Sequence, residues 1–321
     1  MSAMAEPSGD HVTAAASAFG LGAVEGEPVV AARGRQGRVW RVKTRRGDLA
    51  VKELPVGLAE RDVQVDVVLQ STMVNRGVPA PQPLRTTSGA VLVTVGDLQF
   101  RAYAWVDLDE PRRDLDPETL GTLIAMLHRD PLPAEPSTTD YWYTDPVPAQ
   151  EWQETSERLA VARAPFAAEF AASVPGFLAL QEVFGPSGLT QLCHRDLWAD
   201  NVRLASEGGL CVIDWDNCGP AEPAQELAMP LVEFCYDDGE RAARLYRAYR
   251  RAGGPGQLAD PSDFTMVLAQ FGHFAITAGG QWVQATDQTS KGRAEAWFRE
   301  GWEQPVGLPE IERLLHAIRG I

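Results

Sequence analysis

The stretch from His194 to Asp216 constrains this chain more than any other. Polar residues are spaced along it in a fixed order, with His194-Arg195-Asp196, then Asn201, and finally Asp214 and Asp216. Two short runs of the kind found in strands, 202–204 and 210–213, flank a Glu-Gly-Gly turn. Runs of this kind on either side of a glycine-containing turn predict a β-hairpin.

The expected pairing of this hairpin brings oxygen ligands together. Folding about Glu207 and Gly208 would set Val202 opposite Ile213 and Asn201 opposite Asp214, with Asp196 on the preceding loop. Magnesium prefers carboxylates together with substrate phosphates, so an amide oxygen and a carboxylate beside a further carboxylate suit it. The stretch therefore predicts a site for phosphoryl transfer.

At these residues the sequence resembles the kinase-like phosphotransferases, whose catalytic loop reads His-x-Asp with Asn five residues later and a metal-binding Asp beyond a hairpin. Ile213-Asp214-Trp215, followed by Glu226-Leu227-Ala228, is more similar to the aminoglycoside phosphotransferase family than to the protein kinases, which carry Asp-Phe-Gly there. The resemblance implies that Asp196 is the catalytic base and that Asn201 and Asp214 hold Mg²⁺. Arg195 would either offset charge near Asp196 or anchor the loop, and Glu226 would brace it.

The resemblance also implies a fold and a nucleotide. The implied fold is α+β, two-lobed and protein-kinase-like. A small antiparallel-sheet lobe would span residues 1–107, and a larger, mainly helical lobe would span residues 108–321. The phosphoryl donor would be ATP or GTP, with Mg²⁺ as cofactor.

A second hairpin is expected near the N-terminus, over 39–42 and 49–52, after a glycine-containing turn. Backbone N–H groups exposed in such a turn can bind phosphate, although arginine-rich turns are more often only solvated. Strand alternation places a small residue and a cation on one face, as an adenine ring and its phosphates require. The expected nucleotide-binding residues here are Gly34, Gly37, Val39, Ala50 and Lys52.

Residues 58–76 have the apolar spacing of a helix, which the Gly-Val-Pro sequence after it would end. In the family an acidic residue on this helix pairs with the lysine, and the matching position is Asp66. Because Asp is one methylene shorter than the usual Glu, Glu60 and Asp62 remain alternatives.

Two further strands are expected over 90–95 and 100–106, which would complete a lobe of five strands and one helix. The backbone at Trp105 and Val106 would then be the hinge that pairs with the adenine edge in related enzymes. Trp105 could equally be an ordinary strand aromatic.

The C-terminal part reads as mainly helical. Asp116-Pro117 and Asp238 are typical helix starts. Helices are expected near 117–128, 149–164, 166–174, 177–184, 263–275 and 309–319, and a loop is expected to open at Gly219-Pro220. Further helical runs are expected to begin at Glu226 and after Asp238, the second of them stopped by Gly253-Gly254. Phe264 to Thr286 contains no charged residue, but its glutamines and glycines favour a buried helix pair over a membrane span.

Charge is unevenly divided along the chain. Residues 1–107 contain 12 Lys/Arg and 11 Asp/Glu, whereas residues 108–321 contain 17 and 33, a net charge of −16. The acidic part would attract cations and repel nucleic acid, or would simply aid solubility. No secretory signal is recognised, so a cytoplasmic protein without membrane contact is expected.

The acceptor is expected to be a small cationic or sugar-like molecule, because carboxylates lie beside aromatic residues in the acidic part. Candidate contacts are Trp198, Asp200, Asp216, Tyr236 and Asp237. An aminoglycoside-like compound fits the resemblance. A choline, homoserine or hexosamine kinase, or an inactive nucleotide-binding scaffold, remains an alternative, and the sequence does not indicate an oligomeric state.

Overall fold

The computed structural model describes residues 8–33, 37–54, 57–137, 140–186, 188, 190–302 and 306–321. The chain divides into two compact units, one formed by Met1–Arg112 with Ala199–Cys218 and the other by Arg113–Trp198 with Gly219–Ile321. The predicted hairpin of the catalytic stretch thus groups with the N-terminal unit. The lobe boundary at residue 107 stays a prediction.

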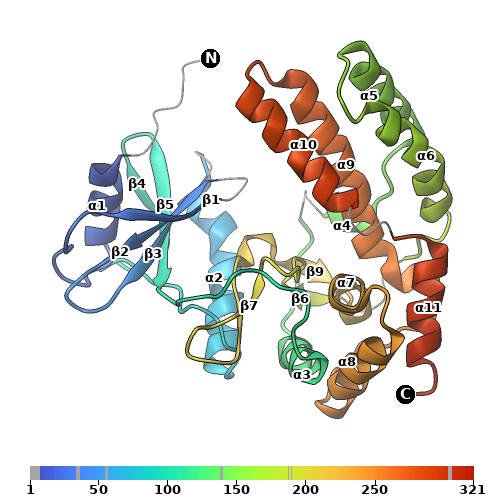
Figure 1. Ribbon diagram of the computed structural model, residues 1–321. Coiled ribbons are helices and arrows are strands. Elements are labelled where there is room, and N and C mark those ends of the chain that lie inside the picture. Colours follow the sequence, from blue (N-terminus) through green and yellow to red (C-terminus); the bar gives the residue numbers. More distant parts are fainter. Residues whose placement is uncertain are drawn as a thin grey trace. The chain divides into compact units, whose positions relative to one another are not determined.

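Unit 1 is built on a five-stranded antiparallel sheet with the order β1-β2-β3-β5-β4 (Figure 1). The strands are β1 Val29–Arg33, β2 Arg38–Val42, β3 Leu49–Leu54, β4 Val93–Val95 and β5 Leu98–Ala104. The expected hairpin of β2 and β3 is confirmed, with Val39 opposite Lys52. The small β7 Val202–Leu204 and β8 Leu210–Val212 pair separately.

Two helices accompany this sheet. Helix α1 Gly9–Ser17 buries Val12 and Ala15 in one core with Trp40, Val51 and other strand residues. Helix α2 Glu60–Asn75 buries Val63 and Val67 in a smaller cluster. Alternation in β3, where Leu49 and Val51 are fully buried, leaves Ala50 and Lys52 on the opposite face.

Unit 2 is mainly helical. Its elements are α3 Pro117–His128, α4 Tyr141–Thr144, α5 Ala149–Val161, α6 Ala167–Gln181, α7 Pro223–Cys235, α8 Gly239–Arg251, α9 Thr265–Gln284, α10 Gln288–Trp302, α11 Leu308–Ile318 and the paired strands β6 Gln191–Cys193 and β9 Gly219–Ala221. The predicted N-caps are confirmed, because Asp116 accepts from the Thr119 N–H and Asp238 from the Arg241 N–H.

Several predicted elements were wrong. Helix α6 runs through Pro175, where two helices were expected, and α9 is one helix instead of a pair. Gly219 and Pro220 belong to β9 instead of opening a loop, and α10 was not predicted. For β9 and α10, tertiary packing outweighed the local signal: Gly219 pairs with Cys193 of β6, and α10 buries Ala294 and Phe298 against α9 and α6.

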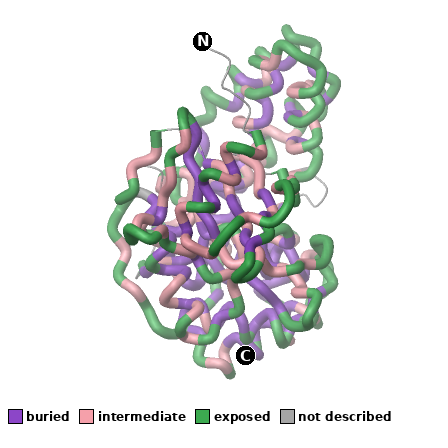
Figure 2. Tube along the Cα trace, turned by 90° about the vertical axis from the view of Figure 1, so that its left-hand side faces the viewer, coloured by how far each residue is buried: buried purple, intermediate pink, exposed green. Residues whose placement is uncertain are grey.

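The core of unit 2 lies between α5, α6, α9 and α10, around Trp152, Phe166, Phe170 and Trp282. In Figure 2 the buried residues, in purple, lie toward the interior, and the exposed residues, in green, lie along the outer turns. Among the residues that the structure describes, no helix combines the length and apolar character that a membrane span requires.

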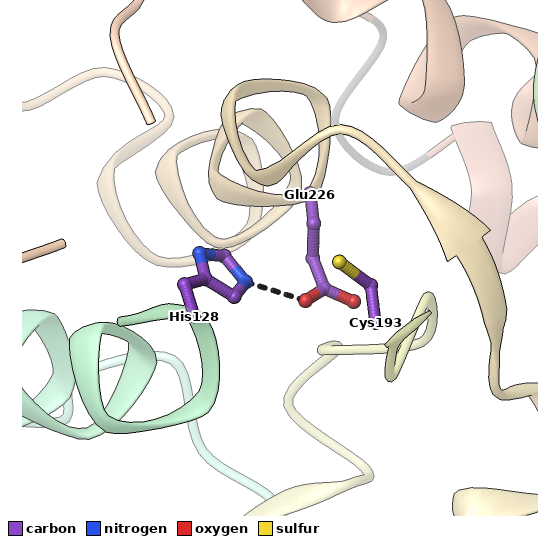
Figure 3. A group of neighbouring side chains, drawn as sticks. All are labelled: His128, Cys193 and Glu226. Carbon is purple, nitrogen blue, oxygen red and sulfur yellow. Dashed lines mark hydrogen bonds and ion pairs between the residues drawn. The ribbon is translucent and has the colours of Figure 1, made fainter. Parts of the chain in front are cut away.

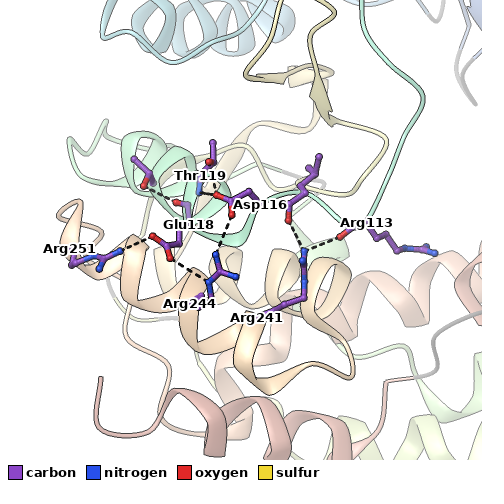
Figure 4. A network of polar contacts seen from close by, with 9 residues as sticks. Arg113, Asp116, Glu118, Thr119, Arg241, Arg244 and Arg251 are labelled. Atoms are coloured by element: carbon purple, nitrogen blue, oxygen red, sulfur yellow. Dashed lines mark hydrogen bonds and ion pairs between the residues drawn. The ribbon is translucent and has the colours of Figure 1, made fainter.

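Helices α3 and α8 approach each other closely. Arg244 and Arg251 on α8 form ion pairs with Asp116 and Glu118 at the start of α3 (Figure 4). These exposed pairs contribute little each. Close packing is set instead by Gly121, because a Cβ there would lie 2.2 Å from the backbone oxygen of Leu245.

Gly121→Ala should therefore lower the free energy of unfolding by about 2 kcal/mol, because two backbones must separate to admit one methyl group. Gly280→Ala in α9 is the matched control, since no described atom lies within 4 Å of the new Cβ. It should be neutral or stabilising by up to about 1 kcal/mol. Denaturant unfolding compares the two variants, and equal stabilities would contradict the packing argument.

Candidate active site

Lys52 lies between two carboxylates of the same unit. Its ammonium is 2.7 Å from an oxygen of Asp214 and 2.7 Å from an oxygen of Asp216, and its side chain is 14% exposed. Burial opposes the charge of Lys52, but the two carboxylates outweigh it and raise its pKa above the ordinary value. Lys52 is therefore a fixed cation beside two oxygen ligands.

Backbone geometry after β8 positions these carboxylates. Asp214 has a φ of 57°, in the left-handed region that few non-glycine residues occupy. The short helix that follows, Trp215–Asn217, is anchored by buried Trp215, whose indole N–H donates to the Val212 oxygen at 3.0 Å. The turn thus directs Asp214 and Asp216 toward β3.

The hairpin register differs from the prediction by one residue. Val202 pairs with Val212, not with Ile213, and the Ile213 N–H donates to the backbone oxygen of Asn201 at 2.9 Å. Gly208 and Gly209 both have positive φ, so the loop holds one residue more than the expected turn. Asn201 is buried and lies at the same end of the hairpin as Asp214.

Asp66 is not an ion-pair partner of Lys52. Its carboxylate lies 3.2 Å from the guanidinium of Arg101, a residue that sequence reasoning missed. Arg101 pairs directly with Lys52 across β5 and β3, and its longer side chain reaches the shorter acid. Of the alternatives, Glu60 accepts from the Val91 N–H, and the side chain of Asp62 lies outside the described residues.

Burial has the largest effect on the pKa of Asp66. Burial raises its pKa to about 8, against the opposing effect of Arg101. With Asp66 protonated, the two cations Lys52 and Arg101 balance the two anions Asp214 and Asp216. The folded state therefore holds a proton that the unfolded chain releases near pH 4.

Because the folded pKa is raised, this proton stabilises the fold at low pH, and the benefit is lost as pH rises through about 8. Between pH 7 and 9 the wild type should lose about 1 kcal/mol of stability relative to Asp66→Asn, which cannot titrate. Denaturant midpoints of both proteins across this range measure the difference. Asp97→Asn, in an exposed turn, should keep a constant offset. A constant offset for Asp66→Asn as well would contradict a pKa of about 8 for Asp66.

Among the described residues, Gly37, Val39 and Ala50 lie on or beside the same sheet. Gly37 needs to be glycine, because a Cβ there would lie 2.5 Å from the backbone oxygen of Glu53. Ala50 pairs with Tyr103, on the face of Lys52. Gly34 lies outside the described residues.

Trp105 and Val106 follow β5, where the hinge was expected. The backbone N–H of Trp105 already donates to the backbone oxygen of Asp48 at 3.1 Å. Its indole N–H donates to Asp107 at 2.7 Å, and the Arg41 guanidinium lies 4.6 Å from the ring centroid. These contacts fix the indole beside β2, and Val106 is partly exposed.

Asp196 and Arg195 lie in unit 2, on the loop that follows β6. Arg195 is a second non-glycine residue with positive φ, at 63°. Its N–H donates to Glu226, and its carbonyl accepts from the Gln270 amide at 3.0 Å. A left-handed arginine costs conformational energy, so these buried contacts hold the residue before Asp196 in place.

The side chain of Arg195 is also fully engaged. Its guanidinium lies 2.6 Å from an Asp140 oxygen and 3.9 Å from the centroid of the Tyr143 ring. Gly219 lies flush beneath it, because a Cβ there would lie 2.2 Å from the guanidinium carbon. These contacts correspond to the loop-anchoring alternative for Arg195.

Glu226 connects this loop to two further helices. One carboxylate oxygen accepts from the Arg195 N–H, and the other lies 2.6 Å from the His128 ring, whose second nitrogen is 3.0 Å from the Tyr249 hydroxyl. Cys193 lies alongside, and the His, Cys and Glu ligand atoms fall within 4.8 Å of one another (Figure 3). Burial alone would raise the pKa of Glu226, but the interactions with His128, His194 and the Arg195 N–H together outweigh it and lower that pKa.

Glu226→Ala should destabilise the protein by about 3 kcal/mol, because it leaves the Arg195 N–H and the His128 ring buried without their acceptor. Glu312→Ala, at an exposed position of α11, is the control, and about 0.5 kcal/mol or less should be lost there. Thermal unfolding of the two variants is the measurement, and similar losses would show that Glu226 is not a brace.

The residues predicted to contact the phosphoryl acceptor belong partly to unit 1 and partly to unit 2. Trp198 packs against Phe271 of α9, with ring centroids 5.6 Å apart, whereas Asp200 lies exposed in a turn of unit 1. Asp216 is engaged by Lys52. Tyr236 and Asp237 line a cavity of about 260 Å³ in unit 2, together with Arg113, Asp114 and Asp238.

Comparison with known proteins gives the fold and the family. Solved structures with the same fold include the spectinomycin phosphotransferase APH(9)-Ia in complex with ADP and spectinomycin (14% identity, 92% of this chain and 94% of that chain, TM-score 0.65). A microcompartment-associated aminopropanol kinase (17% identity, 90% and 95%, TM-score 0.55) and an ethanolamine kinase from Plasmodium vivax (12% identity, 87% and 82%, TM-score 0.53) are similar too. No curated protein sequence matches the chain.

The α+β, protein-kinase-like fold expected from the sequence is thus confirmed. A model of the phosphotransferase enzyme family matches residues 29–260, most of the chain. The protein belongs to that family, and it is a phosphotransferase.

Proposed function

We propose that this phosphotransferase moves the γ-phosphoryl group of ATP to a hydroxyl of a small molecule. The observation that carries the proposal is Lys52 held between Asp214 and Asp216, a fixed cation beside oxygen ligands on one face of the sheet. Phosphoryl transfer needs positioning and charge stabilisation more than covalent chemistry. Lys52, Asp214 and Asp216 supply the cation and the oxygen ligands that phosphoryl transfer uses.

Unit 1 supplies the nucleotide and metal residues. Lys52 would bind the phosphates, and Asp214 with Asn201 would hold Mg²⁺, because carboxylate and amide oxygens are the ligands this ion prefers. Bound there, Mg²⁺ would neutralise charge on the transferred phosphoryl group. The ADP and AMP complexes of the spectinomycin enzyme support an adenine nucleotide as donor.

Unit 2 supplies the base. Asp196 would orient the acceptor hydroxyl and take its proton late, since a loose transition state demands little of a base. Arg195, fixed through Glu226 and Asp140, would hold the Asp196 backbone in the reactive conformation.

The acceptor we propose carries an amine, as in aminoglycosides or amino sugars. Residues 108–321 have 33 acidic and 17 basic residues, and this excess attracts cations. A similar structure contains spectinomycin, and others act on aminopropanol or ethanolamine according to their names. Antibiotic resistance or self-protection would be the biological role.

With Mg²⁺ and ATP, a panel of aminoglycosides, amino sugars, choline and homoserine should yield one compound that gains a phosphate, detected by mass spectrometry. Asp196→Asn should slow that reaction by about 10² or more, the usual contribution of a positioned base. Asp214→Asn should act at least as strongly, and Asp97→Asn, in an exposed turn, should have no effect. Full activity of Asp196→Asn would contradict the mechanism. Nucleotide binding without transfer to any compound would favour a scaffold.

A further inference from the structure

Arg101 is a second buried cation beside Lys52. The two residues pair directly across β3 and β5, so their side chains share the face that also carries Ala50 and Tyr103. The side chain of Arg101 is 2% exposed, and its guanidinium lies 5.4 Å from the centroid of the Tyr103 ring. An arginine so deeply buried costs several kcal/mol unless anions compensate it.

The acidic partners of Arg101 come from two separate segments, and Asp216 is the one that carries the compensating charge when Asp66 is protonated. One guanidinium nitrogen of Arg101 lies 3.2 Å from Asp66 on α2 and 3.1 Å from Asp216 after β8. The other oxygen of Asp216 lies 2.7 Å from the Lys52 ammonium. A continuous chain of close polar contacts therefore runs from Asp66 through Arg101 and Asp216 to Lys52.

Nucleotide binding would change only one end of this chain. If Asp214 holds the metal ion and Lys52 the phosphates, as proposed above, their 2.7 Å contact must be exchanged for contacts with the ligand. The Asp216 contact of Lys52 need not be broken. Arg101 keeps that carboxylate oriented and its charge compensated while the exchange takes place.

We propose that Arg101 is a positioning residue for phosphoryl transfer, which connects helix α2 to Lys52 through Asp216. The inference rests on the proposed function. Asp216 is then the lasting partner of Lys52, in place of a direct contact from an acid on α2. The chain of close polar contacts presets the position of the ammonium before the phosphates arrive.

Calorimetric titration with Mg²⁺ and the non-hydrolysable ATP analogue AMP-PNP tests this role. Arg101→Met should weaken binding of the analogue at least tenfold, and Asp216→Asn should do the same, because each breaks the chain. Binding of adenosine, which carries no phosphate, should change less than twofold in both. Arg45→Met is the control, since Arg45 is exposed and its nearest carboxylate oxygen, on Glu25, is 3.8 Å away.

A purely structural role would lower the melting temperature of Arg101→Met and leave its affinity for the analogue unchanged, which would overturn the proposal. Equal loss of adenosine binding would overturn it too. Arg101→Lys keeps the charge on a shorter side chain whose single nitrogen is placed differently, so its contacts with the two acids should weaken and an intermediate loss is expected. If Arg101→Met does not fold, Arg101→Lys and Asp216→Asn decide the question, and wild-type affinity in both would contradict the inference.

The two proposals fail differently. A wild-type protein that binds no Mg²⁺–AMP-PNP contradicts the proposed function itself. If Arg101→Met and Asp216→Asn bind the analogue as tightly as the wild type does, only the role of Arg101 is contradicted.

Discussion

The buried ion pairs around Lys52 are the constraint on which unit 1 depends. Two cations on neighbouring strands, Lys52 and Arg101, can be buried only if carboxylates reach them. Their acidic partners come from α2 and from the turn after β8, segments far apart in the sequence. Charge compensation therefore determines how the helix, the sheet and the small hairpin of this unit fit together.

In unit 2 the main constraint is the left-handed backbone conformation of Arg195, the residue before the proposed base. Backbone contacts from Glu226 and Gln270 and side-chain contacts from Asp140 and Tyr143 determine the conformation of Arg195 from all sides. A positive φ thus occurs at Arg195, which precedes the proposed base, and at Asp214, which is a proposed metal ligand. Strain of this kind persists only where surrounding contacts over-determine it.

Much of this arrangement could be predicted because it rests on local signals. Turn glycines, helix caps and strand alternation located the β2–β3 hairpin, the starts of α3 and α8, and Lys52 on its face. Arg101 could not be recognised, since a charged residue in a strand usually points to water and its acids are distant in sequence. The hairpin register also escaped prediction, because two consecutive positive-φ glycines lengthen the loop by one residue.

The most direct test of this account is a crystal structure of the protein with Mg²⁺ and AMP-PNP. The account predicts that the Lys52 ammonium leaves Asp214 for the phosphates while it keeps Asp216, and that Arg101 still joins Asp216 to Asp66. Lys52 remaining on Asp214, or losing Asp216 for a direct contact with Asp66, would contradict it.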